Sequence, residues 1–165
     1  MSDEERQSVD AEVYEKARRE IESQLQTANN EIDAHEIVVQ ELHDRFDHYS
    51  WVGVYVVESD ELVLSAWAGP EETEHTRIPI GEGICGLAAK TGETEVVPDV
   101  SEREEFIACF PSTRAEIVVP IHGADGVVGE IDVDSDWEDA FDERDRELLE
   151  TVAAKVAKVM EAGGA

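Results

Sequence analysis

Two segments rich in β-branched residues, joined by a short loop that contains glycine, constrain the fold of this chain most. They span residues 114–121 and 127–134. Their composition is typical of strands, and Gly123 and the Asp-Gly pair at 125–126 supply turn chemistry between them. The sequence therefore predicts an antiparallel hairpin here.

Acidic residues gather on one face of this predicted hairpin. Strand side chains alternate between faces, so Glu130, Asp132 and Asp134 share one face of the second strand. Glu116 joins them if the acidic faces of the two strands coincide. Like charges on adjacent strands repel, so such a cluster needs solvent, a cation or raised pKa values. The pattern fits either a solvated outer face or a pocket for a positively charged group of a ligand.

The whole chain is acidic, with 41 aspartates and glutamates against 13 lysines and arginines and a formal net charge of −28. A field of this sign opposes binding to nucleic acids and anionic membranes, and we expect neither as a partner. The acids are spread along the sequence, a pattern that keeps a protein soluble in concentrated salt, where charges are screened over about 3 Å. We therefore expect a halophilic source.

The sequence shows neither a targeting segment nor a membrane span. The N-terminal residues lack the apolar core of a signal peptide, and no apolar run approaches the roughly 20 residues of a span. We therefore expect a cytoplasmic protein. In a reducing compartment, Cys85 and Cys109 are expected to be free or redox-active thiols and not to form a structural disulfide.

The remaining periodicities predict helices at both ends of the chain. Predicted helices span 9–28, 31–47, 83–90 and 143–160, and further predicted strands span 51–57, 62–67 and 94–98. This order predicts an α+β fold: an antiparallel sheet with the N- and C-terminal helices on one face and loops plus short helices over a pocket on the other. We expect a single domain over 1–165, with N-terminal helices in 1–48 and a core with the C-terminal helix in 50–160.

The first predicted helix carries a narrow apolar stripe. Apolar residues recur every fourth position from Val9 to Leu25. A stripe of this width suits packing against one neighbour, which includes a partner chain. We therefore expect a homodimer that forms through the terminal helices.

Trp51 and Tyr55 share a face of the strand at 51–57 with Gly53. Core packing is one interpretation of these aromatic side chains. The other is an aromatic wall of a pocket, in which Gly53 leaves room for a ligand or a close backbone.

The two cysteines differ in their surroundings. Cys85 lies near the start of the predicted helix 83–90, where backbone N–H groups favour a thiolate. Cys109 lies among apolar neighbours between Phe106 and Phe110, which fits an inert buried thiol or a reactive one.

No convincing metal site is visible. Four acids occupy calcium-loop positions, but Trp137 stands where the loop needs glycine. His43 and His48 are five residues apart, so they do not share a helical face, and we expect them at the surface. We therefore expect no metal.

Five segments together resemble the GAF domain family, and within it the free methionine-(R)-sulfoxide reductases. The resemblance extends from about residue 50 to 156, and it is carried by 51–55, 77–86, 106–109, 115–120 and 129–135. The two cysteine contexts are its most specific part.

The resemblance implies reduction of free L-methionine-(R)-sulfoxide to methionine. Cys109 would attack the sulfoxide sulfur and become a sulfenic acid, and a disulfide with Cys85 would resolve it. Thioredoxin or a small thiol would then reduce the disulfide, and no bound cofactor is expected. The remaining implied site residues hold the substrate: carboxylates Glu116, Asp132 and Asp134, and rings Trp51 and Tyr55 around the S-methyl end.

One position departs from the family pattern. His75 stands where many members have a third, resolving cysteine. This departure affects the recycling step and leaves two interpretations of the chain. One is the reductase; the other is a non-catalytic small-molecule-binding or redox-sensing GAF module that works through its terminal helices.

Overall fold

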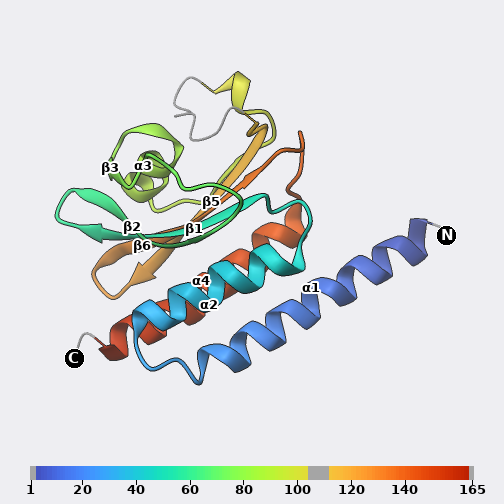
Figure 1. Cartoon of the computed structure of the whole chain (residues 1–165), viewed down its shortest axis with the longest axis horizontal. Helices are drawn as coiled ribbons and strands as arrows, with labels where there is room; N and C mark the ends of the chain where they lie inside the picture. Colours follow the sequence, from blue (N-terminus) through green and yellow to red (C-terminus); the bar gives the residue numbers. More distant parts are fainter. Residues whose placement is uncertain (1–2, 104–111, 164–165) are drawn as a thin grey trace.

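The computed structural model describes residues 3–103 and 112–163 of the chain. Among these residues, one antiparallel sheet of six strands lies between helices on its two faces (Figure 1). The strands, in sheet order, are β3 (Arg77–Pro79), β2 (Glu61–Ala68), β1 (Trp51–Glu58), β6 (Gly126–Ser135), β5 (Ala115–Gly123) and β4 (Glu95–Val97). Both predicted hairpins are confirmed as β1–β2 and β5–β6. β4 lies at the sheet edge, as the proline that follows it predicts.

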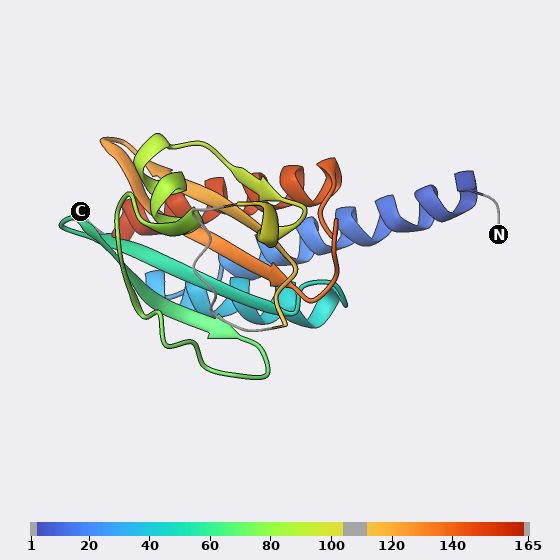
Figure 2. The ribbon, with the colours of Figure 1, turned by 90° about the horizontal axis from the view of Figure 1, so that it is seen from above.

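The helices are arranged in the predicted layers. α2 (Glu31–Arg45) and α4 (Glu143–Gly163) lie against one face of the sheet, and α1 (Asp3–Leu25) packs on them from outside (Figures 1 and 2). α3 (Gly83–Thr91) and the 3₁₀ turn η1 (Val100–Glu102) lie on the opposite side. α1 begins and ends earlier than the predicted 9–28. In the part of the chain that is described, none of the helices combines the length and apolar character that a membrane crossing requires.

Two hydrophobic clusters follow from the alternation of side chains along the strands. Ile131 and Val133 of β6 join the larger cluster, which lies between the sheet and the helices α1, α2 and α4. Trp51 and Tyr55 of β1 join a smaller cluster beneath α3. The second cluster lies on the face of β6 that carries the acidic residues, so that face is covered.

Side-chain capping fixes the start of α4. The Asp142 carboxylate accepts a hydrogen bond from the Arg144 N–H at 2.9 Å, and Asp145 accepts one from the Asp142 N–H at 2.8 Å. Asp145 is buried and also accepts from the hydroxyls of Tyr14 (2.6 Å) and Tyr49 (2.8 Å). This carboxylate therefore ties α1 and the start of β1 to α4.

The prediction that His48 is a surface residue was wrong. Its Nε2 lies 2.9 Å from the same Asp145 carboxylate, and its ring stacks on Trp137. Sequence spacing could not reveal this partner, because Asp145 lies far along the chain. His43 keeps a partly exposed side chain.

Gly129 of β6 is the point where β1 and β6 approach too closely for a side chain. A Cβ at this position would lie 2.4 Å from the backbone oxygen of Tyr55, which cannot move without breaking the strand pairing. We expect Gly129→Ala to lower the free energy of unfolding by about 2–3 kcal/mol, measured by urea denaturation. Gly123→Ala is the matched control, because its Cβ would meet a movable methyl of Val128. Equal losses for both variants would contradict this explanation.

His35 gives stability a dependence on pH. The ring is buried between α2 and β2, its Nδ1 lies 2.7 Å from the Ser65 hydroxyl, and burial lowers its pKa from 6.5 to about 4. Between these two pKa values, the unfolded chain binds a proton at His35 that the folded chain does not bind. The free energy of unfolding therefore decreases as the pH falls below 6.5. We expect a loss of about 2 kcal/mol between about pH 7 and pH 5.

The check compares urea unfolding of the wild type and His35→Gln across this range. Carboxylates titrate alike in both proteins and cancel in the difference. The glutamine variant should lose less stability on acidification, and two parallel curves would show that His35 does not carry the effect.

Candidate active site

The register of three strands places the acidic residues side by side. Asp134 pairs with Trp51 of β1 and with Glu116 of β5, and Asp132 pairs with Gly53 and Val118. Cross-strand partners share a face of the sheet. The predicted cluster of Glu116, Glu130, Asp132 and Asp134 on one face is therefore confirmed.

This acidic face is buried beneath α3, which excludes the solvated outer face. The side chains of Glu116, Glu130, Asp132 and Asp134 are at most 4% exposed. Both carboxylate oxygens of Glu130 and of Asp132, and one of Asp134, have no hydrogen-bond partner among the described residues. Buried polar atoms without partners are costly, so these oxygens point to a group that binds here.

Burial raises the pKa values of the acidic residues on β6. Loss of solvation raises the pKa of Glu130 and Asp134 well above the usual range, and repulsion from Asp132 raises both further. Burial raises the pKa of Asp132 as well, although Glu116 and Cys85 act to lower it. These raised pKa values favour protonated carboxyl groups in the cluster, one of the outcomes that the sequence pattern allows.

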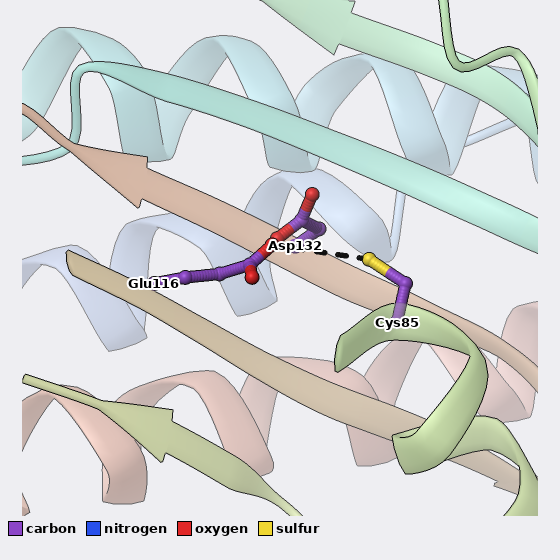
Figure 3. Close-up of side chains that lie close together, drawn as sticks. All are labelled: Cys85, Glu116 and Asp132. Carbon is purple, nitrogen blue, oxygen red and sulfur yellow. Dashed lines mark hydrogen bonds between the residues drawn. The ribbon is translucent and has the colours of Figure 1, made fainter. Parts of the chain in front are cut away.

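Cys85 points from the first turn of α3 toward the acidic cluster (Figure 3). Its Sγ lies 3.9 Å from Oε2 of Glu116. The helix N-terminus, which the sequence predicts to favour the thiolate, does not give Cys85 a low pKa. Burial raises the pKa of Cys85 well above its ordinary value, and the carboxylates of Asp132, Glu130, Glu116 and Asp134 add to the shift.

Trp51 and Tyr55 are both buried, and both donate hydrogen bonds to the loop between β2 and β3. The Trp51 indole donates to the Glu71 carbonyl at 3.2 Å, and the Tyr55 hydroxyl donates to the His75 carbonyl at 2.9 Å. The space over Gly53 is taken by the Trp51 ring, because a Cβ there would lie 2.3 Å from it. Gly53 thus accommodates a neighbouring ring and not a ligand.

A small cavity lies between Cys85 and the loop that carries His75. Its volume is about 10 Å³, room for about one water molecule, and it is lined by His75, Ile78, Glu82, Gly83, Ile84, Cys85 and Glu116. A ligand larger than one water molecule does not fit this cavity. His75 stands at the position of the family's third cysteine, which was the signal for its place near the site. Glu82 was not expected to line a cavity, because nothing local in its sequence places it beside Cys85.

The structure brings together Cys85, Glu116, Asp132 and Asp134, with Trp51 and Tyr55 on the neighbouring strand. Cys109 and Phe106 lie outside the described residues, so the predicted nucleophile has no position relative to this site. Glu130 is the acid that the family resemblance did not include. Its alternation with Asp132 and Asp134 was the signal that placed it on the same face.

Comparison with known proteins gives consistent results. The model of the GAF domain family matches residues 31–161. GAF domain-containing protein A of Dictyostelium discoideum is 39% identical over 139 residues, 84% of this chain and 86% of that protein. Free methionine-R-sulfoxide reductase of Saccharomyces cerevisiae is 41% identical over 113 residues, 66% of this chain and 62% of the yeast protein.

Among solved structures, an X-ray structure of free methionine-R-sulfoxide reductase from Neisseria meningitidis in complex with its substrate superimposes with a TM-score of 0.86. The two chains are 37% identical, and the alignment covers 92% of this chain and 90% of the other. The arrangement of helices and strands is therefore shared over nearly the whole length.

Proposed function

This chain belongs to the GAF domain family, and from its buried acidic cluster we propose that it reduces free L-methionine-(R)-sulfoxide to methionine. The observation that carries the proposal is the set of partnerless carboxylate oxygens of Asp132 and Asp134, which lie beside Glu116 and the Cys85 thiol. Relatives named free methionine-R-sulfoxide reductase add support.

The acidic cluster suits the ammonium group of a free amino acid. An ammonium has three N–H donors, and buried carboxylates offer acceptors that lack other partners. A peptide-bound methionine sulfoxide has no ammonium, so it would leave these acids unpaired. The proposed site therefore selects the free amino acid.

Cys109 is the proposed nucleophile, as the family resemblance implies. Its sulfur bonds to the sulfoxide sulfur, and the sulfoxide oxygen takes up protons and leaves as water. A water molecule then attacks the sulfur of Cys109 and breaks the sulfur–sulfur bond, which gives cysteine sulfenic acid and methionine and releases a proton. The net change moves one oxygen atom from the substrate to the thiol. A carboxyl group kept protonated in the cluster, such as Asp134 with its raised pKa, is the proposed source of the proton. Trp51 and Tyr55 are proposed to enclose the S-methyl end.

Recycling needs a thiol that attacks the sulfenic acid and releases water. Cys85 is the proposed resolving residue, and thioredoxin or a small thiol then reduces the disulfide. The raised pKa of Cys85 slows this step, because the thiolate is the attacking species. Since His75 replaces the usual third cysteine, a small external thiol is expected to support turnover better than thioredoxin does.

A homodimer through the terminal helices is a further part of the proposal. α1 buries Ala17 and Ile21 against the rest of the chain, whereas Val13 toward its free end is 42% exposed. Sedimentation velocity in molar salt tests this expectation, and a single species with the mass of one chain would contradict it.

The test of the proposed activity uses purified protein in molar salt with dithiothreitol. Release of methionine is expected from free L-methionine-(R)-sulfoxide. The S epimer and N-acetylmethionine sulfoxide serve as matched negative substrates, since one presents the wrong face of sulfur and the other lacks the ammonium. No release from the R epimer by folded protein would overturn the proposal and favour a non-catalytic ligand-binding or redox-sensing module.

A further inference from the structure

Cys85, Glu116 and Asp132 form a compact set of metal-binding side chains. They come from α3, β5 and β6, and one ligand atom from each lies within 4.8 Å of the other two. Figure 3 shows the three side chains pointing toward one another. All three are buried, so the set is not a chance gathering of surface acids.

A second observation is independent of this geometry: buried carboxylate oxygens here lack hydrogen-bond partners within residues 3–103 and 112–163. Both oxygens of Asp132, which is fully buried, have no hydrogen-bond partner, and the same holds for its neighbour Glu130. Among the described residues, no lysine or arginine lines the adjoining cavity. Buried acids of this kind are normally paired or bound to a metal.

The ligand set and the space favour a zinc-like cation. A thiolate with carboxylates selects thiophilic ions, whereas calcium and magnesium prefer all-oxygen sites. Zinc needs ligand atoms about 3.5 Å apart, given bonds of about 2.3 Å to sulfur and about 2.0 Å to oxygen. Cys85 Sγ and Glu116 Oε2 are 3.9 Å apart, so small side-chain rotations suffice. The cavity beside Cys85, about 10 Å³, holds one ion but not an amino acid.

We propose that Cys85, Glu116 and Asp132 bind one zinc-class divalent cation and that this cation competes with the substrate ammonium for the acidic cluster. Binding exchanges the thiol proton of Cys85 for a metal–sulfur bond and leaves one coordination position for water. The proposed cation site is supported by the ligand geometry. Only the competition between the cation and the substrate rests on the proposed function. Free zinc would thereby act as an inhibitor of the reductase.

The binding test titrates the full-length, metal-free, reduced protein with Cd²⁺ and follows the ultraviolet charge-transfer band of a cadmium–thiolate bond. Cadmium bound to surface acids gives no such band, which removes the background from this acidic chain. We expect saturation at one Cd²⁺ per chain and loss of the band when Zn²⁺ is added.

Variants identify the ligands. The chain has two cysteines, so Cys85→Ser should abolish the band and Cys109→Ser should keep it. Glu116→Gln should weaken Cd²⁺ binding at least about tenfold, and the exposed Glu58→Gln serves as its matched control. Persistence of the band in Cys85→Ser, or its loss in Cys109→Ser, would overturn the site. If Cys85→Ser does not fold, Glu116→Gln decides alone.

Competition between the cation and the substrate is tested in a separate experiment, on protein that shows reductase activity. Zn²⁺ should raise KM for methionine sulfoxide and leave kcat unchanged, in a buffer with a non-chelating phosphine reductant. A fall in kcat at constant KM would overturn the competition. The absorption band needs no turnover, so absence of reductase activity and absence of the metal site give distinct results.

Discussion

Cys109→Ser should abolish methionine release, with turnover reduced at least about 10³-fold in both single-turnover and steady-state assays. A serine hydroxyl cannot supply the electron pair that a thiolate gives to the sulfoxide sulfur, and it forms no sulfenic acid. The assay uses free L-methionine-(R)-sulfoxide with dithiothreitol in molar salt, and circular dichroism confirms that the variant is folded.

Cys85→Ser is the matched control for this experiment. It removes the buried thiol beside Glu116 but leaves the proposed nucleophile. Methionine should therefore appear in a single turnover, whereas steady-state turnover with thioredoxin should fall. If Cys85→Ser loses the first turnover and Cys109→Ser keeps it, the roles of the two cysteines are reversed.

Asp132→Asn should lower kcat/KM about 10²- to 10³-fold, because a buried charged partner of the substrate ammonium costs several kcal/mol to remove. Asp132 is fully buried at the centre of the cluster, opposite Gly53 and Val118, and its oxygens have no hydrogen-bond partner in the part of the chain that the structure describes. Burial disfavours its charged form, which raises its pKa. The neutral amide should therefore raise the free energy of unfolding while activity falls.

Opposite changes in activity and stability distinguish substrate binding from a structural role. Steady-state kinetics and urea unfolding at about pH 7 provide the two measurements. Asp136→Asn is the matched control, since it makes the same charge change four residues further on at an exposed position. Parallel losses of activity and stability in Asp132→Asn, or equal losses in both variants, would argue against ammonium binding.

Much of the architecture could be predicted because it depends on local periodicity. The hairpins β1–β2 and β5–β6 and the helices α2 and α4 follow from spacing and turn chemistry, and their ends lie within a few residues of the predictions. α1 was less well defined, since its narrow stripe leaves most of its surface polar. Predictions about individual side chains failed where the partner lay far along the chain, as with His48 and Asp145.

The amino-acid sequence by itself determined that Glu130, Asp132 and Asp134 share one face of a strand, because alternation is a property of the extended backbone. It left open whether Glu116 joins them, and the observed register, which pairs Glu116 with Asp134, decided that it does. Only the tertiary structure decided that this face is buried, because the covering helix α3 comes from a different part of the chain. That burial removes solvent from the acids and leaves a cavity the size of one ion. It also raises the pKa of Cys85, although the position of Cys85 near the helix N-terminus favours a thiolate.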